Sequence, residues 1–192
     1  MEGIRYLILR GFDGQYQLTL VIGTNVLPEA LMNDLMAIEG LVSVYISVNT
    51  DRHSHDPFGP MVLHKAGLKT IEVTLDGLRY ALSPTAFFQL NTVQASAIFN
   101  KVVSLINPNE VALDAYCGVG AMSLPIARKA KKVIGLEINK ASVLAAIDNA
   151  ALNGITNVSF SQGDVQKVLP EILKTEKIGV LVMDPPRSGL SD

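Results

Sequence analysis

The sequence lacks several features that mark whole classes of protein. Its single cysteine, Cys117, excludes an internal disulfide bond and fits a reducing compartment. There is no recognisable signal peptide and no apolar run long enough to span a bilayer, so we expect a cytoplasmic location and no membrane partner. With 16 basic and 18 acidic residues the net charge is −2, which gives no overall signature of nucleic-acid binding.

Two local clusters of basic or metal-ligating residues are present, and neither predicts a binding site. The basic run at residues 128–132 lies between an expected helix and an expected strand, and such a run is typical of a solvated helix end favoured by the helix dipole. Residues 49–67 are predicted to form a loop that contains His53, His55 and His64. A His-x-His pair could bind a metal, but no acid and cysteine partners complete the set, so we expect no metal site.

With 192 residues and 48% apolar content, the chain can bury a core and hold one or two domains. Its first half, residues 1–83, predicts a small α+β unit, because strand-like runs with Asp-Gly hairpin turns surround one short helical pattern. The expected elements are strands at residues 5–10, 15–22 and 41–48, a helix from Pro28 to Gly40, and a hairpin of residues 70–75 and 78–82.

The second half, residues 84–192, alternates buried apolar strands with helical patterns, which predicts an α/β fold with a parallel sheet. The expected strands lie near residues 111–114, 132–137, 158–162 and 178–184. The expected helices are residues 92–106, 121–129 and 140–152, with a linker between the last two strands. The apolar face of the first helix is predicted to be Val93, Ala97, Ile98, Val102 and Leu105.

The most informative segment is Asp114-Ala-Tyr-Cys-Gly-Val-Gly120, which follows an apolar run and precedes a helical stretch. A strand that ends in an acid and turns through two glycines into a helix lets the backbone approach a ligand closely. About twenty residues further on, Glu137 ends a second strand, where a carboxylate can accept hydrogen bonds from both hydroxyls of a ribose. The Gly-x-Gly spacing alone is a weak signal, but the two acid-ended strands together indicate a nucleoside-cofactor site.

Charge at the strand ends narrows the choice of cofactor. Asp114 would repel a pyrophosphate, so S-adenosylmethionine, a sulfonium nucleoside without phosphate, fits better. Two further strands end in Asp164 and Asp184, and ligands of open α/β sheets bind outside the carboxyl ends of the strands. Asp164 could meet the adenine amino group or simply cap a loop. The two prolines of Asp184-Pro-Pro-Arg187 predict a stiff corner suited to holding a planar base.

Four segments resemble the class I S-adenosylmethionine-dependent methyltransferases: Asp114–Gly120, Gly135–Glu137, Asn149–Gly154 and Asp184–Arg187. More specifically, Ser83-Pro-Thr-Ala-Phe-Phe-Gln-Leu-Asn91 looks like the signature of the RNA uracil-5-methyltransferases, which make 5-methyluridine in 23S ribosomal RNA or in the T-loop of transfer RNA. The resemblance covers nearly the whole chain. It implies a Rossmann-like methyltransferase sheet, incomplete in its C-terminal half, at residues 84–192, preceded by a small α+β domain at residues 1–83.

The resemblance also implies roles for individual residues. Glu137 would bind the ribose, Tyr116 would lie against the methionine or sulfonium part, and Asp164 would lie near the adenine. Gln89 and Asp184 would face the flipped uracil as well as the cofactor. The full set of implied cofactor-binding residues is Gln89, Tyr116, Gly118, Glu137, Asp164 and Asp184.

Carbon 5 of uracil is a poor nucleophile, and the family activates it with a cysteine thiolate that adds to carbon 6, followed by a carboxylate base that removes the carbon 5 proton. By resemblance both groups are expected beyond Asp192, so no catalytic residue is assigned and we expect a central fragment that methylates nothing alone. Cys117 is expected to be a small buried residue of the cofactor loop. At least one of Phe87 and Phe88 is expected to pack in a core rather than stack on a base.

The expected partner is RNA, with ribosomal RNA favoured over transfer RNA. Only four of the seven strands of a class I sheet are expected, so the last strand would present an open edge and could cause self-association. Two alternatives stay open. One is a methyltransferase acting on another RNA base, at cytosine carbon 5 or at an amino nitrogen. The other is a nucleoside- or RNA-binding module without catalysis.

Overall fold

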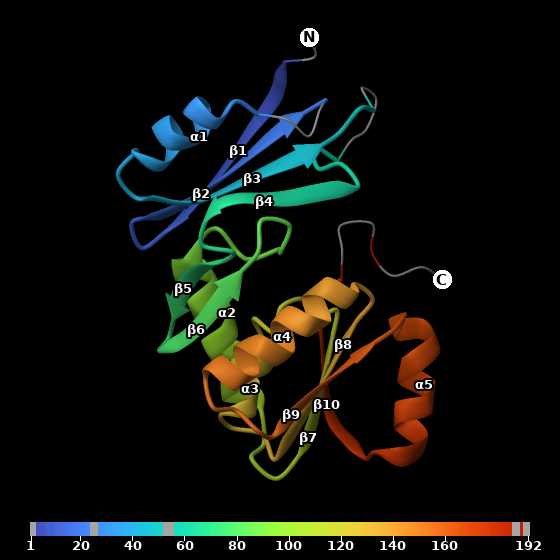
Figure 1. Ribbon diagram of the computed structural model, residues 1–192. Helices are drawn as coiled ribbons and strands as arrows, with labels where there is room; N and C mark the ends of the chain where they lie inside the picture. The colour runs from blue at the N-terminus through green and yellow to red at the C-terminus, as the bar shows by residue number, and fades with distance from the viewer. Residues whose placement is uncertain (1–2, 24–26, 52–55, 186–188, 190–192) are drawn as a thin grey trace. The chain divides into compact units, whose positions relative to one another are not determined.

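The computed structural model describes residues 3–23, 27–51, 56–185 and 189, and Figure 1 shows its elements. The chain divides into two compact units, one of residues 1–73 with 81–85 and the other of residues 74–80 with 86–192. A hairpin of β5 (Ile71–Leu75) and β6 (Leu78–Leu82) contributes to both units. The predicted boundary after residue 83 stays a prediction.

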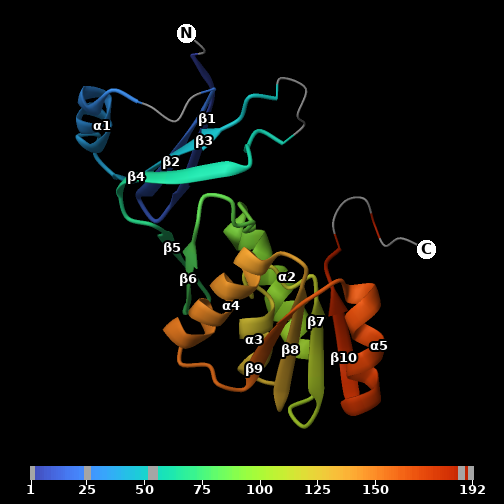
Figure 2. The same cartoon turned by 45° about the vertical axis from the view of Figure 1, so that its right-hand side comes forward.

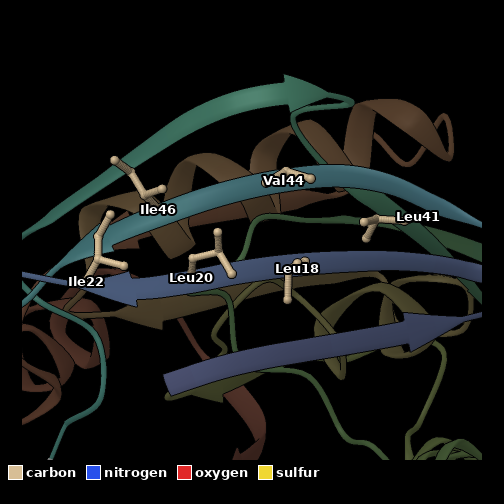
Figure 3. Close-up of a cluster of buried hydrophobic side chains, with 6 residues drawn as sticks. All are labelled: Leu18, Leu20, Ile22, Leu41, Val44 and Ile46. Atoms are coloured by element: carbon tan, nitrogen blue, oxygen red, sulfur yellow. The ribbon is translucent and has the colours of Figure 1, made fainter. Parts of the chain in front are cut away.

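In the described residues of the first unit, a four-stranded sheet carries one helix. Its elements are β1 (Ile4–Phe12), β2 (Gln15–Ile22), α1 (Glu29–Met36), β3 (Leu41–Val48) and β4 (Met61–Gly67). The strand order is β1-β2-β3-β4, with β2 and β3 parallel and the two outer pairs antiparallel. Leucine, valine and isoleucine side chains of β2 and β3 form the core under α1 (Figure 3). The three predicted strands and the helix are therefore confirmed.

Strand β4 was missed by the sequence analysis, which assigned residues 49–67 to a loop. Its sequence does not alternate apolar and polar residues, and it becomes a strand because it pairs with β3 along the edge of the sheet. His64 lies on this strand with its ring edge-on to Tyr45, the ring centroids 5.0 Å apart. His53 and His55 lie outside the described residues.

The second unit contains the parallel sheet that the sequence predicted, which confirms the fold class. Its elements are α2 (Thr92–Leu105), β7 (Val111–Ala115), α3 (Ser123–Ala127), β8 (Lys132–Glu137), α4 (Lys140–Leu152), β9 (Val158–Gln162), α5 (Val165–Thr175) and β10 (Ile178–Met183). The strand order is β10-β7-β8-β9, and all three pairings are parallel. Helix α5 covers one face of this sheet, and α2, α3 and α4 cover the other (Figures 1 and 2).

The segment between β9 and β10 was expected to be a linker and is helix α5. Pro170 within it suggests a break, but this proline is exposed on the helix surface, while Val165 and the half-buried Val168, Leu169 and Ile172 pack on the sheet. Their spacing of three and four residues is that of one helical face, and burial of this face stabilises the helix despite the proline.

The apolar face predicted for α2 was mostly wrong, and only Val102 of its five residues packs against the core. Val93, Ile98 and Leu105 are 74, 57 and 71% exposed, whereas Ala95 and Phe99 are buried. Because apolar residues occur all around this helix, periodicity could not decide which side meets the sheet.

Side chains of the basic run at residues 128–132 form hydrogen bonds and an ion pair within the second unit. The Arg128 guanidinium donates to the carbonyls of Asp76 and Gly77 at 2.7 and 2.8 Å, which clamps the β5–β6 turn. The Lys129 ammonium donates to the carbonyls of residues 103 and 104 at the end of α2, and Lys132 pairs with Glu176. Three of its four basic side chains thus bond within the protein.

Candidate functional site

The candidate site lies beyond the carboxyl ends of β7 and β10. The chain runs from β7 outward to β8 and β9 and then returns to β10 on the other side of β7. Such a reversal leaves a crevice where ligands of open α/β sheets bind. Here a partly open hollow of about 60 Å³ is lined by residues from both strand ends, among them Asp114, Tyr116, Val182 and Asp184.

The loop after β7 holds its backbone in an unusual conformation. Tyr116, Gly118 and Gly120 have φ values of 65°, 55° and 82°, in the left-handed region that favours glycine. A Cβ atom on Gly120 would lie 3.2 Å from the Phe160 ring, whereas a Cβ on Gly118 would meet no protein atom within 4 Å. The space beside Gly118 is thus open to a ligand.

Glu137, at the end of β8, is tied to this loop through its carboxylate. Its Oε2 accepts a hydrogen bond from the Gly118 amide at 3.1 Å, and its Oε1 accepts one from the Asn139 amide at 2.8 Å. The side chain stays partly exposed. Each carboxylate oxygen has a further lone pair, so the fixed carboxylate can still accept hydrogen bonds from two neighbouring hydroxyls of a ligand.

Asp114 is the buried acid of the site. Its side chain is 2% exposed, and its Oδ2 accepts a hydrogen bond from the Ser123 hydroxyl at 2.5 Å. Burial raises the pKa of Asp114 to about 7; the Ser123 bond opposes this, and the nearby Asp184 and Glu137 carboxylates add to it. The carboxyl group therefore changes charge close to neutral pH.

Most of the predicted site residues meet at this crevice. Gln89, Tyr116, Gly118 and Asp184 line the hollow, and Glu137 adjoins it through the Gly118 amide.

Asp164, in contrast, does not line the hollow. It is the N-cap of α5, and its Oδ1 accepts from the Gln166 amide at 3.0 Å. This is the capping role left open as the alternative. Pro186 and Arg187 of the diproline corner lie outside the described residues.

Several lining residues were not assigned to the site from the sequence. Asp114 was noted as a strand end but given no place in the cofactor set, and its burial could not be read from the sequence. Phe99 reaches the hollow from the buried face of α2, and that face had been assigned incorrectly. Met122 and Val182 also line it and carry no sequence signal beyond their apolar character.

The neighbouring phenylalanines separate into two environments. Phe88 is buried, with its ring centroid 5.1 Å from that of Tyr80, and therefore packs in the core. Both phenylalanines line the hollow, but Phe87 is 72% exposed, so its ring is the more accessible to a ligand. The prediction that at least one of them packs in a core is consistent with this arrangement.

Cys117 is unsuited to nucleophilic chemistry in this structure. It is 5% exposed, and burial, with the nearby Asp114 and Glu137 charges, raises the pKa of its thiol well above the usual range. A thiolate is the reactive form, so this cysteine stays protonated and inert at neutral pH.

The electrostatics of the crevice favour a cationic ligand. Asp114 and Asp184 line it, Glu137 lies beside it, and no Lys or Arg is among the described lining residues. These carboxylates would repel a phosphate and attract a sulfonium. Among the described residues, no group of three or more His, Cys, Asp or Glu side chains could hold a metal ion, and no helix has the length and apolar character to cross a membrane.

Comparison with known proteins agrees with this reading of the site. Residues 106–186 match a family described as a methyltransferase domain. An uncharacterized RNA methyltransferase of Gloeobacter violaceus is 38% identical over 97% of this chain, and one of Clostridium tetani is 35% identical over 97%. The chain spans only 41 and 42% of the lengths of these two relatives.

Solved structures show the same fold. The tRNA (uracil-54, C5)-methyltransferase of Pyrococcus abyssi, solved with S-adenosyl-L-homocysteine, superposes with a TM-score of 0.79 over 98% of this chain and 45% of its own, at 26% identity. Trm5b of the same organism gives 0.58 at 20% identity over 97% of this chain and 54% of its own, a likeness of fold alone. The domain match and the relatives show that this chain is similar to RNA methyltransferases, and the carboxylate-lined crevice fits S-adenosylmethionine as the cofactor.

Proposed function

We propose that this chain carries the cofactor site of an enzyme that methylates carbon 5 of uridine in RNA. The observation that carries the proposal is the crevice at the β7–β10 reversal, where Asp114, Glu137 and Asp184 gather around an open glycine loop that the Ser83–Asn91 segment adjoins through Gln89. The Pyrococcus neighbour, by its description a tRNA (uracil-54, C5)-methyltransferase, supports the choice of base. We place the activity in the cytoplasm.

The cofactor residues then have distinct tasks. Glu137 accepts hydrogen bonds from the ribose hydroxyls, and its two backbone contacts hold it for that task. Gly118 leaves room for the nucleoside, and Tyr116 lies against the methionine part. Asp164 caps α5 with Oδ1, and its Oδ2, which lies 3.8 Å from the Lys167 ammonium, would accept from the adenine amino group. When bound, S-adenosylmethionine supplies an electrophilic methyl group on a sulfonium.

The target base would meet Gln89 and Asp184. Both line the hollow, and their amide and carboxylate groups can pair with the imide edge of uracil, with its N–H donor and carbonyl acceptors. The exposed Phe87 ring offers a stacking surface next to them.

Methylation at carbon 5 also needs a thiolate nucleophile and a general base. Cys117 is not assigned the first role, because its thiol is buried and its pKa is raised. We therefore propose that residues 1–192 bind the cofactor and the base but form no 5-methyluridine unaided. A nucleoside-binding module without catalysis is the second candidate, and the inert Cys117 favours it for this stretch of chain.

Calorimetric titration with S-adenosylhomocysteine tests the cofactor site. We expect saturable binding at one site, weakened about tenfold or more by Glu137→Ala, because a fixed acceptor for two ribose hydroxyls is lost. Ser96→Ala, on the surface of α2, is the matched control and should leave the affinity unchanged. ATP should not compete, since the carboxylates repel its phosphates. Wild-type binding of ATP that equals binding of S-adenosylhomocysteine would refute the site.

Binding of short RNAs tests the choice of base. With saturating S-adenosylhomocysteine, an oligoribonucleotide with one unpaired uridine should bind more tightly than its cytidine counterpart, and Gln89→Ala should remove the difference. A 23S ribosomal RNA fragment and a T-loop hairpin form two arms, because the preference for ribosomal RNA stays a prediction. Equal affinity for uridine and cytidine would leave cofactor binding intact but refute the uracil assignment.

A further inference from the structure

The first unit has an apolar groove on its sheet, and none of the residues that line it belongs to the proposed methyl-transfer site. The groove has a volume of about 600 Å³ and runs between β1 and α1. Its floor and walls include Leu7 and Leu9 of β1, Leu18 and Leu20 of β2, and Leu31 and Leu35 of α1.

The side chains of β1 that line the groove are far more exposed to solvent than side chains of a hydrophobic core. Leu7 and Leu9 are 66 and 62% exposed, and Ile38, just after α1, is 55% exposed. Leu18 and Leu20 belong to the β2–β3 core (Figure 3). Leu7 pairs in register with Leu20, and Leu9 with Leu18, so both exposed leucines continue this apolar row onto the edge strand. A contiguous apolar surface of this kind marks an interaction site.

The dimensions of the sheet leave room for one more helix. Neighbouring strands lie about 4.8 Å apart, so four strands span roughly 14 Å, and packed helices lie about 8–10 Å apart. One face of a four-stranded sheet therefore accepts two helices side by side. Helix α1 packs on β3 and β4, and the place over β1 and β2 is the groove.

The one charged side chain among the described residues that line the groove is acidic, namely Glu39. The basic residues of β1, Arg5 and Arg10, donate hydrogen bonds to the backbone carbonyls of residues 49, 51 and 83. Asp34 is exposed on the side of α1 that Leu31 and Ile38 share, three and four residues away along the helix, and with Glu39 it forms an acidic rim. An occupant with an apolar stripe and basic flanks would complement both the floor and the rim.

The same charges argue against other occupants. A second copy of this chain would bring its own acidic rim against this one. A fatty acid would place its carboxylate near Glu39. A peptide helix with lysine or arginine beside its apolar stripe meets neither problem.

We propose that the groove between β1 and α1 is the docking site of a basic amphipathic helix from outside residues 1–192. Its apolar residues, at spacings of three and four, would cover Leu7 and Leu9, and its basic residues would lie along Asp34 and Glu39. The helix would complete the second layer over the sheet, in the helix-in-groove manner.

Fluorescence anisotropy with a labelled synthetic peptide tests this proposal. The probe is a 14-residue helical peptide with a leucine stripe and lysine flanks, and its counterpart carries glutamate in place of every lysine. We expect saturable binding of the lysine peptide, and binding of the glutamate peptide weaker by about tenfold or more. Glu39→Lys should weaken the first and strengthen the second, whereas equal binding of the two peptides would refute the acidic-rim argument.

Substitutions on the two faces of β1 locate the binding. Leu7→Gln with Leu9→Gln should weaken the lysine peptide about tenfold or more, because two apolar contacts are lost. Tyr6→Gln, on the same strand but not lining the groove, is the matched control and should have no effect. Hydrogen exchange of the wild-type chain gives a readout without mutation: the peptide should slow exchange in α1 and β1 and leave β9 unchanged.

Two results would assign the groove differently and overturn the proposal. One is a dimer in light scattering that the Leu7 and Leu9 substitutions abolish while the lysine peptide does not bind. The other is oleate that displaces the peptide and binds equally well to Glu39→Lys.

Discussion

Ionisation of Asp114 should make the affinity for S-adenosylmethionine depend on pH. The pKa of this buried carboxyl is raised to about 7, so about nine tenths of it is protonated at pH 6 and about nine tenths is ionised at pH 8. A sulfonium cation in the crevice favours the ionised form and should lower this pKa, typically by about two units for an opposite charge at close range. The cofactor should thus bind more tightly as pH rises through 7.

The size of the effect follows from the two pKa values. With a pKa of about 7 in the free protein and about two units lower in the complex, binding at pH 8 should be roughly ninefold tighter than at pH 6. S-adenosylhomocysteine has a neutral sulfur but the same amino, carboxyl and adenosine groups. Titration of the groups that both ligands share therefore cancels in the ratio of their two affinities. The pH dependence of this ratio then comes from the acids of the site.

Calorimetric titrations of both ligands between pH 5.5 and 8.5 measure this ratio. Asp114→Asn should flatten its pH dependence, because the amide cannot ionise. Ser123→Ala removes the hydrogen bond that stabilises the ionised carboxyl and should move the midpoint to higher pH. A ratio that stays constant with pH in the wild-type chain, or a dependence unchanged in Asp114→Asn, would refute the reasoning.

Three further predictions concern stability and assembly. The pKa of Asp114 in the folded state is raised from 3.8 to about 7, so between these two pH values folded chains keep a proton that unfolded chains lose. The free energy of unfolding should therefore fall by up to about 4 kcal/mol as pH rises from the lower value to the higher one. Urea titrations measure this decline, and Asp114→Asn should remove it. Gly135→Ala would place a Cβ 2.4 Å from Phe160 Cδ1 and 2.9 Å from Cys117 Sγ, so it should lower the free energy of unfolding by about 1–3 kcal/mol in the same assay. Adding Phe160→Leu should restore part of this free energy, and no recovery in the double variant would contradict the clash. Among the described residues, β10 pairs with another strand on one side only, and its Leu181 is 41% exposed. Leu181→Lys should therefore reduce self-association, which light scattering measures. A wild-type chain that stays monomeric at high concentration would contradict a contact through this sheet edge.

The sequence was a good guide wherever a feature depended on neighbouring residues. The apolar runs that became β7 to β10 and the Asp-Gly turns of both hairpins were predicted at nearly their observed positions. Such features are local, because a short apolar run indicates a strand of a parallel sheet and a tight turn needs residues that tolerate positive φ. The acids at the strand ends could be placed at one edge of the sheet for the same reason.

The errors arose where local patterns allowed two solutions. The α5 segment has helical spacing but contains Pro170, and only packing of its apolar face on the sheet decides that it is a helix. Helix α2 is apolar on several sides, and the sheet decides that Phe99 rather than Val93 is buried. Strand β4 exists because β3 has a free edge to pair with.

The sequence by itself determined the kind of site. A Gly-x-Gly turn lets the backbone approach a ligand, and acids at strand ends can accept hydrogen bonds from it, and both properties belong to the residues themselves. Only the tertiary structure decided which acids share the crevice and in what state. It buried Asp114 against Ser123, and it tied Glu137 to the Gly118 amide 19 residues away. Burial and pairing depend on residues far apart in the chain, and these contacts set both the geometry and the charge of the site.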